Sequence, residues 1–369
     1  MRLKFSDSAA GRGFSLIELM ITIAISMIIT TALGSIFISS AKLKAENDRL
    51  GEQIENGRFA LDTLTQELRL AGYWGGMDMD LVRGYYRNYA ARPSSLPDPC
   101  LTSTSELRDA LPIHIQGDDS SSALSCLSDV KSGTDVVVIR RAGTCAVGET
   151  GCDSAVVSGA PYFQASFCSP NNGTELATVL GSASAWTDLL DDWFIVASGG
   201  STFGLHKMLA SDLANCNVST NLAPVRPYKV KIFFVANNTA ASDGIPALKL
   251  AELGASGFTI VTLASGIEQL QMEYGVDLSG DGVPEAYTAN PGAYNSCGLT
   301  TCVDNWMNVV AVKIHLLARN TSLSPDYTDG KTYNLGNNAD GAANTVGPFN
   351  DHYRRQPFNA LVKTINIRG

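Results

Sequence analysis

The sequence predicts an α+β protein, in which one long N-terminal helix packs on an antiparallel β-sheet domain with long, disulfide-pinned loops. Three observations predict it. Residues 19–41 form an uncharged apolar run, apolar residues then recur at helical spacing to about residue 74, and short alternating runs separated by turn residues fill the remainder. The expected divisions are a basic leader at 1–13, a membrane-spanning helix at 14–41, an amphipathic helix at 42–74 and a β-rich domain at 75–369.

The apolar run is long enough to cross a bilayer. Its 23 residues would reach about 35 Å as a helix, against roughly 30 Å of hydrocarbon. A cleaved secretory signal is the alternative, but its apolar part is only ~7–15 residues long. One carboxylate, Glu18, stands at the start of the run. An acid at a membrane edge requires a charged partner, because burying it at mid-bilayer costs about 2.5–3.5 kcal/mol.

The amphipathic helix is predicted from a heptad-like seam. The seam consists of Leu43, Asn47, Leu50, Ile54, Gly57, Leu61, Leu64 and Leu68. Gly51 and Gly57 each cost roughly 1 kcal/mol of helix propensity relative to Ala, so we expect a kink or a close contact at these positions.

The β-rich domain is predicted from eight runs that are rich in strand-forming residues. They are residues 135–142, 193–199, 203–209, 228–236, 247–253, 259–276, 308–319 and 359–368. In the run at 228–236, Lys229 and Lys231 fall on one face, as in a half-exposed strand. Residues 91–129 are rich in Pro, Ser and Asp and are predicted to form a long surface loop pinned by a disulfide.

Eight cysteines, all in loop-like stretches, indicate disulfides in an oxidising compartment. Zinc binding is disfavoured because no close Cys/His pairs of the usual spacing are present. Sequence neighbours can close most simply, although eight cysteines allow 105 pairings. This reasoning predicts the pairs Cys100–Cys126, Cys145–Cys152, Cys168–Cys216 and Cys297–Cys302.

A loop rich in Asp and Gly is a candidate calcium site. Asp277, Ser279, Asp281 and Glu285 occupy positions 1, 3, 5 and 9 of an EF-hand-like loop, with a glycine at position 6. Thr288 stands at position 12, where a bidentate Glu is usual. An ordinary Asp/Gly turn between two strands is the alternative. The sequence suggests no cofactor other than this Ca²⁺.

Catalytic signatures are absent from the sequence. It contains no G-x-S-x-G, H-E-x-x-H, P-loop or G-x-G-x-x-G motif. The four histidines, His114, His206, His315 and His352, are scattered along the chain. The net charge of −9 disfavours a nucleic-acid surface, which would need a basic face. We therefore expect a protein that is not an enzyme and does not bind nucleic acid.

The N-terminal stretch "RGFSLIELMI" resembles the class III signal of type IV pilins and pseudopilins. This resemblance implies that prepilin peptidase cleaves after Gly13 and methylates the amine of Phe14. It also implies that Glu18 neutralises the N-terminal amine of a neighbouring subunit during assembly. Major pilins often carry a proline in this helix, whereas the first proline here is Pro93, which puts a family-type kink in doubt.

A second phrase, "ENGRFALDTLTQELRLAGYWGG" at 55–76, resembles the PilW-type minor pilins specifically. Later stretches extend that resemblance to the end of the chain, among them "YGVDLSGDGVPEAY" and the closing "YRRQPFNALVKTINIRG". About residues 80–225 resemble no family. The resemblance implies a type IV pilin-like fold and a minor pilin in a priming or tip complex, active in pilus assembly and in pilus-dependent adhesion or twitching motility.

The implied partners are other minor pilins, the major pilin, prepilin peptidase and the inner-membrane assembly platform. The implied location is the bacterial inner membrane, as a single-pass protein with a periplasmic C-terminal domain, and afterwards the pilus at the cell surface. A minor pseudopilin of type II secretion is one alternative. A membrane-anchored periplasmic enzyme or receptor is another, and it would need a convergent polar cluster in the middle region.

Overall fold

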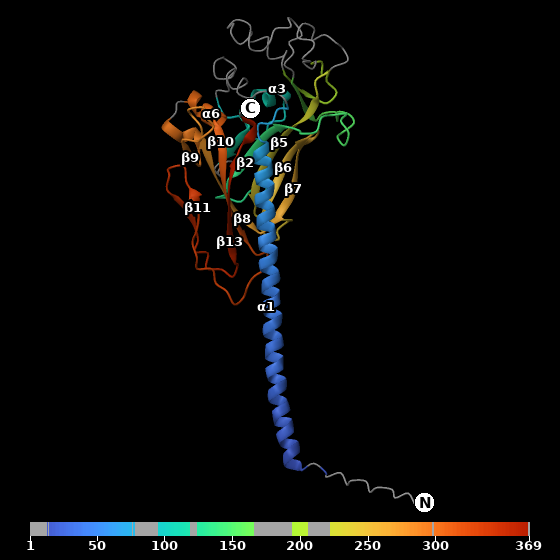
Figure 1. Cartoon of the computed structure of the whole chain (residues 1–369), viewed down its shortest axis with the longest axis vertical. Helices are drawn as coiled ribbons and strands as arrows, with labels where there is room; N and C mark the ends of the chain where they lie inside the picture. Colours follow the sequence, from blue (N-terminus) through green and yellow to red (C-terminus); the bar gives the residue numbers. More distant parts are fainter. Residues whose placement is uncertain are drawn as a thin grey trace, which may run out of the picture. The chain divides into compact units, whose positions relative to one another are not determined.

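The protein is described here from a computed structural model, which describes residues 13, 15–75, 77, 95–118, 124–165, 194–205, 222–296 and 299–367. Within these residues the chain is a long helix followed by antiparallel strands, so the predicted α+β class is confirmed (Figure 1). The contacts divide the chain into two units, Met1–Gly51 and Glu52–Gly369.

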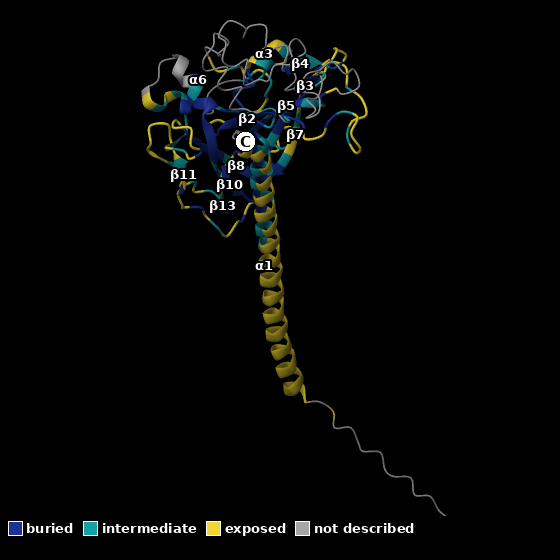
Figure 2. Cartoon of the chain, turned by 45° about the horizontal axis from the view of Figure 1, so that its top comes forward, coloured by how far each residue is buried: buried dark blue, intermediate teal, exposed yellow. Residues whose placement is uncertain are grey.

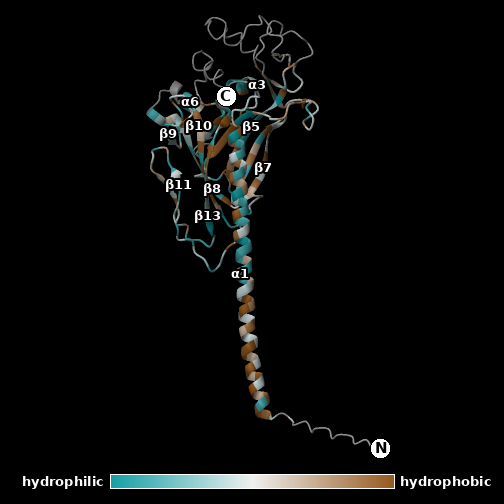
Figure 3. Ribbon diagram, in the orientation of Figure 1, coloured by the Kyte–Doolittle hydropathy of each residue, from teal (hydrophilic) through white to brown (hydrophobic). Residues whose placement is uncertain are grey.

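Helix α1 runs from Leu16 to Leu70 without interruption. Its first part is strongly apolar, and α1 is a helix long and apolar enough to cross a membrane (Figure 3). The helix was expected to continue to residue 74, but it ends at Leu70. Gly72 has a φ of 69° and donates its N–H to the carbonyl of Arg140. A glycine in the left-handed region just after the last turn is a common helix stop.

The second unit contains a seven-stranded antiparallel sheet. Its path runs β1 (Ile115–Asp118), β2 (Val136–Ala142), β5 (Val225–Ala236), β3 (Pro161–Ala165) and β4 (Phe194–Ser198). Off this path, β6 (Ala247–Gly254) pairs with β5 and with β7 (Gly257–Ser265). The short helix α3 (Thr104–Asp109) precedes β1.

A second antiparallel sheet has the order β13 (Arg355–Lys363), β10 (Val309–Arg319), β8 (Ile267–Val276) and β9 (Ala286–Thr288). A separate hairpin joins β11 (Tyr333–Asn337) to β12 (Ala343–Val346). Helix α6 (Leu299–Met307) leads into β10, and short 3₁₀ turns occupy Pro291–Ser296 and Ile365–Ile367.

Six of the eight predicted runs coincide with strands, although their ends shift by a few residues. The run at 259–276 is two strands, because Gly266 turns the chain with a φ of 76°. A Cβ there would lie 2.4 Å from the carbonyl oxygen of Arg319, so the turn requires glycine. The run at 203–209 is not a strand over its described residues, 203–205, and the rest, including His206, lies outside the described residues.

The prediction that residues 91–129 form only a surface loop is wrong. This stretch contains α3 and β1, and Leu107, Leu111, Ile113 and Ile115 are fully buried. Its Pro- and Ser-rich composition concealed the short apolar segment 107–115, which reaches the core. The error arose because composition was weighed over a window longer than the elements inside it.

One hydrophobic core joins α1 to both large sheets (Figure 2). The buried positions of α1 are Gln53, Gly57, Ala60, Leu64 and Leu68. Of the predicted seam, Gly57, Leu64 and Leu68 are buried against the sheets, whereas Ile54 is 41% exposed. The buried position in this turn is Gln53, one residue before the predicted Ile54. Apolar spacing could not indicate it, because Gln53 is polar and is buried through hydrogen bonds to carbonyls of the β-sheet domain.

Candidate functional site

Glu18 lies in the first turn of α1 and closes a capping box with Ser15. The backbone N–H of Ser15 donates to Glu18 Oε2 at 2.9 Å. The backbone N–H of Ile17 donates to the Ser15 hydroxyl at 3.2 Å. Together these two bonds satisfy backbone donors at the start of the helix, in a variant of the capping box in which Ser15 accepts from the second helical residue and not from Glu18. The spacing Ser-x-x-Glu is a sequence signal for this cap, but the analysis of the sequence did not use it.

The structure says little about the two residues at the predicted cleavage site. Gly13 is exposed, and Phe14 lies outside the described residues. Cleavage after Gly13 therefore stays a prediction. In the cleaved chain Ser15 would be the second residue, so the Glu18 cap would form within one turn of the new amine.

The C-terminal part of α1 is fixed to the sheets by polar contacts. The amide of Gln53 donates to the carbonyls of Ala318 and Arg354 at 2.7 and 3.0 Å. Glu67 accepts from Arg141 and Lys231, with Lys231 Nζ at 2.6 Å. The strand pattern suggested that Lys231 faces solvent. Its side chain is instead only 13% exposed, because it lies beside the helix and pairs with Glu67.

Gly57 allows the helix to approach β13 closely. A Cβ on Gly57 would lie 2.3 Å from the ring of Phe358. Gly51, by contrast, would meet nothing within 4 Å. Of the two glycines for which a kink or a close contact was expected, Gly57 marks a close contact.

Among the described residues two disulfides are present, Cys100–Cys126 and Cys145–Cys152. They match the first two predicted pairs. The first closes the segment that carries α3 and β1, and the second closes a short loop after β2. Cys168, Cys216 and Cys297 lie outside the described residues, and the side chain of Cys302 is not described, so the other two pairs stay predictions.

The loop after β8 brings the predicted carboxylates together. Oxygen atoms of Asp277, Asp281 and Glu285 lie within 4.8 Å of one another. Asp277 is buried, whereas the other two are exposed. Thr288 is not part of this group, because it lies in β9, opposite Tyr274.

Hydrogen bonds within the loop hold these carboxylates in place. Asp277 accepts the N–H groups of Gly280 and Gly282 at 2.6 and 2.7 Å. Glu285 accepts those of Leu278 and Ser279 at 2.7 and 3.0 Å. Hydrogen bonds from Ser279 and from the backbone lower the pKa of Glu285 to about 2. The oxygens suit a hard cation such as Ca²⁺, and calcium binding stays a prediction.

The described histidines lie apart in different contacts. His114 Nε2 lies 3.0 Å from the carbonyl oxygen of Val309. His315 Nε2 lies 3.0 Å from the carboxylate of Glu273 in the neighbouring strand. His352 Nδ1 lies 2.6 Å from the carbonyl oxygen of Tyr327. Each of these contacts joins one segment of the fold to another.

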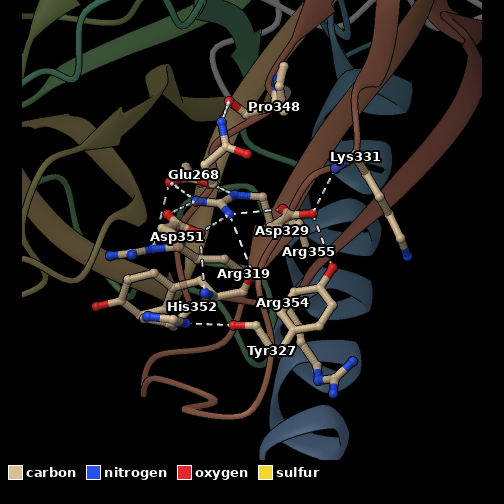
Figure 4. Close-up of polar contacts among 12 residues, drawn as sticks. Glu268, Arg319, Tyr327, Asp329, Lys331, Pro348, Asp351, His352, Arg354 and Arg355 are labelled. Carbon is tan, nitrogen blue, oxygen red and sulfur yellow. Dashed lines mark hydrogen bonds and ion pairs between the residues drawn. The ribbon is translucent and has the colours of Figure 1, made fainter.

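A buried ionic cluster surrounds Arg355 at the start of β13 (Figure 4). Its side chain is 0% exposed, and it contacts Asp329 at 2.9 Å and Asp351 at 2.7 Å. It also donates to Glu268 of β8, with Nη2 at 3.2 Å from Oε1. The cluster ties the segment between β10 and β13 to the second sheet.

Arg355 keeps its charge although it is buried. Burial alone would lower the pKa of its guanidinium, but hydrogen bonds to Asp351 and Glu268 outweigh this effect and raise that pKa. The same ion pair lowers the pKa of Asp351. Aromatic rings pack on this arginine and its neighbours, with the Arg355 guanidinium 3.7 Å from the centroid of Phe349 and that of Arg354 4.2 Å from Tyr327. No local sequence pattern predicts this cluster, although the stretch "YRRQPF" contains its central residue, Arg355.

Comparison with known proteins gives two matches to protein families. Residues 232–366 match the family described as type IV pilus-assembly protein W. Residues 10–34 match the prokaryotic N-terminal methylation motif. These ranges include Gly13, Phe14 and Glu18, and most of the strands from β5 to β13. The Asp/Gly loop and the Arg355 cluster also lie inside the first match.

A type IV-like pilin from Thermus thermophilus is similar to the chain at 15% sequence identity. The similarity covers 38% of this chain and 68% of that chain, with a TM-score of 0.21. No curated protein matches the chain.

The methylation-motif match includes the stretch "RGFSLIELMI", and the pilus-assembly match includes "YGVDLSGDGVPEAY" and most of the closing stretch. The phrase at 55–76 lies in neither match. Together the two matches support the identification of the chain as a PilW-type minor type IV pilin.

Proposed function

We propose that this minor pilin takes part in a priming or tip complex from which a type IV pilus grows. One observation carries the proposal: a match to the pilus-assembly protein W family covers residues 232–366. The N-terminal methylation motif at 10–34 includes the start of α1. This single helix has an exposed, apolar first part, and its last part is fixed to the sheets. Such a helix can join a subunit to a helical bundle while its own domain stays folded.

The proposal includes the route to the cell surface. The chain is inserted in the inner membrane with its C-terminal domain in the periplasm, and the disulfides suit that oxidising compartment. Prepilin peptidase then cleaves it, and the assembly platform adds it beside other minor pilins and the major pilin. Adhesion and motility follow from the pili that this complex starts.

A gene-deletion strain tests the proposal. Loss of the chain should abolish or strongly reduce surface pili, measured by shearing and electron microscopy, and the wild-type gene should restore them. Type II secretion should remain normal in the same strain. Normal piliation together with lost secretion would instead support the pseudopilin alternative. A normal phenotype in both measurements would contradict an assembly role.

A further inference from the structure

Strand β7 forms an open edge of the seven-stranded sheet. It pairs with β6 on one side, and within the described residues no backbone hydrogen bond is formed on its other side. Alternate residues of an edge strand direct their N–H and C=O groups outward. Figure 1 shows β7 as the outermost strand beside β6. The edge therefore offers a row of unused donors and acceptors.

The other edges of the two large sheets have features that hinder strand addition. β9 has only three residues, and β1 has four, ending in Asp118. β4 has five residues. β13 carries Pro357 and Lys363, and its Phe358 lies against α1 at Gly57. Short length, proline, charge and a covering helix are the usual means of protecting a sheet edge.

β7 lacks most of this protection. Its nine residues, GFTIVTLAS, include no charged residue and no proline. A register shift lies near its C-terminal end, between the pairs Leu248–Ala264 and Lys249–Thr262. Residues 257–262 remain regular, which corresponds to about 20 Å of strand at ~3.4 Å per residue. An edge of this length without charge is a template for pairing with another chain.

The side chains of β7 indicate the chemistry of the segment that would pair with it. Phe258 and Ile260 pack on the core, whereas Thr259 and Val261 are exposed, Val261 by 46%. An added strand would extend this alternation. It should place apolar residues next to Phe258 and Ile260, with small or polar residues next to Thr259 and Val261.

We propose that β7 is a docking edge for an extended, uncharged segment of a neighbouring pilus subunit, which adds to the seven-stranded sheet as a further strand. This inference rests on the proposed function, because a neighbouring subunit is present only if the chain enters the pilus assembly. Main-chain hydrogen bonds would supply the contact, and the alternating side chains would select the partner.

Hydrogen exchange tests the proposal directly. The full chain in detergent micelles is compared with the tagged full chain captured from sheared pili, and exchange is followed by mass spectrometry in the peptide that contains 257–265. Strand addition should slow about half of the β7 amides by roughly tenfold or more in the pili, because alternate N–H groups gain an acceptor. The peptide that contains β13 should change little, since its edge is already covered.

A matched pair of variants supplies the second measurement. Val261→Lys places a charge on the open edge, whereas Leu361→Lys places the same charge at a 62% exposed position of β13. Both should melt at the wild-type temperature. Val261→Lys should enter pili several-fold less than Leu361→Lys, measured by quantitative blotting of the sheared fraction.

The results separate this inference from the proposed function. If the chain is present in pili with unchanged β7 exchange, strand addition is overturned and the assembly role stands. Equal entry of the two lysine variants also overturns strand addition. If the wild-type chain never enters the pilus fraction, both proposals are contradicted.

Discussion

At the residue scale, single polar side chains connect parts of the fold that are far apart in sequence. Gln53 and Glu67 fix the helix to strands, and Arg355 fixes a long connection to the second sheet. Glu18 instead acts locally, as part of a cap on α1. Two predictions concern these residues.

Glu18 has a local role in the cap and a proposed role in assembly, and two substitutions separate them. Glu18→Gln keeps a hydrogen-bond acceptor for the Ser15 N–H, because Gln also closes a capping box, but it removes the charge. Glu18→Ala removes both. If the charge is what assembly requires, both variants should be inserted and cleaved normally, and both should enter pili poorly. If only the cap matters, Glu18→Gln should assemble like the wild type. Blots of membrane and sheared fractions distinguish these outcomes.

Removing Arg355 should destabilise the domain strongly. Arg355→Met leaves the buried Asp329 without a guanidinium partner and leaves Glu268 with only the longer contact to Arg319, at 3.8 Å. Breaking a buried ion pair in this way costs about 3–5 kcal/mol of the free energy of unfolding. The control is Arg354→Met, next in sequence, which loses the contact with Tyr327 and should cost at most about 1 kcal/mol. Denaturant unfolding of the full chain in detergent measures both. Equal stability of the two variants would show that the cluster contributes little.

At the scale of elements, the sequence predicted which segments are helix and strand better than it predicted their partners. Apolar periodicity located α1 and six of the predicted strand runs. It did not locate β1, β3, β9, β11 or β12, each of which has three to five residues. For the candidate site, local spacing brought Asp277, Asp281 and Glu285 together correctly. The Arg355 cluster was not foreseeable as a whole, since only Asp351 is close to Arg355 in sequence, whereas Glu268 and Asp329 are brought to it by the fold.

The helix glycines give a matched test of how α1 packs. Gly57→Ala places a Cβ 2.3 Å from the ring of Phe358, so the ring or the helix must shift. Overpacking of this kind costs typically about 1–3 kcal/mol. Gly51→Ala meets nothing within 4 Å and should gain up to about 1 kcal/mol of helix propensity. Thermal melts of the full chain should therefore shift in opposite directions. A higher melting temperature for Gly57→Ala would show that the helix is not held closely at β13.

The Asp/Gly loop gives a test that depends on both calcium and pH. If Asp277, Asp281 and Glu285 bind Ca²⁺, millimolar Ca²⁺ should raise the melting temperature of the folded chain relative to chelator. A weak site is expected, with a Kd of about 10⁻⁴–10⁻³ M, because Thr288 supplies no bidentate ligand. Asp281→Ala should abolish the shift. An unchanged melting temperature in the wild-type chain would leave the loop as an ordinary turn.

The pH dependence of this loop follows from Glu285. Its pKa is about 2 in the folded chain, below the ordinary value of 4.5. A carboxylate with a lowered folded pKa stabilises the fold above its unfolded pKa and loses this contribution as the pH falls toward the folded pKa. The stabilisation should therefore be complete above about pH 5 and lost toward pH 2, and Glu285→Gln should flatten this part of the profile.

At the scale of the whole molecule, the proposed function requires the same chain to reside first in a membrane and then in a protein filament. The apolar first part of α1 suits both settings, because neighbouring helices can replace lipid around it. Its acid at residue 18 suits only a setting that supplies a positive charge. Cleavage after Gly13 would create such a charge, an amine at Phe14, on every subunit.

The mature chain should therefore begin at Phe14 and carry a methylated amine, as the match to the N-terminal methylation motif over residues 10–34 also suggests. Mass spectrometry of the N-terminal peptide from the membrane fraction measures this directly. A strain without prepilin peptidase is the control, and there the chain should keep Met1 and stay out of pili. A start at Lys42 would indicate an ordinary secretory signal, and the exported protein would then lack the helix that joins it to a filament. A start at Met1 in the wild-type strain would indicate a plain membrane anchor, and Glu18 would have no newly formed amine to pair with.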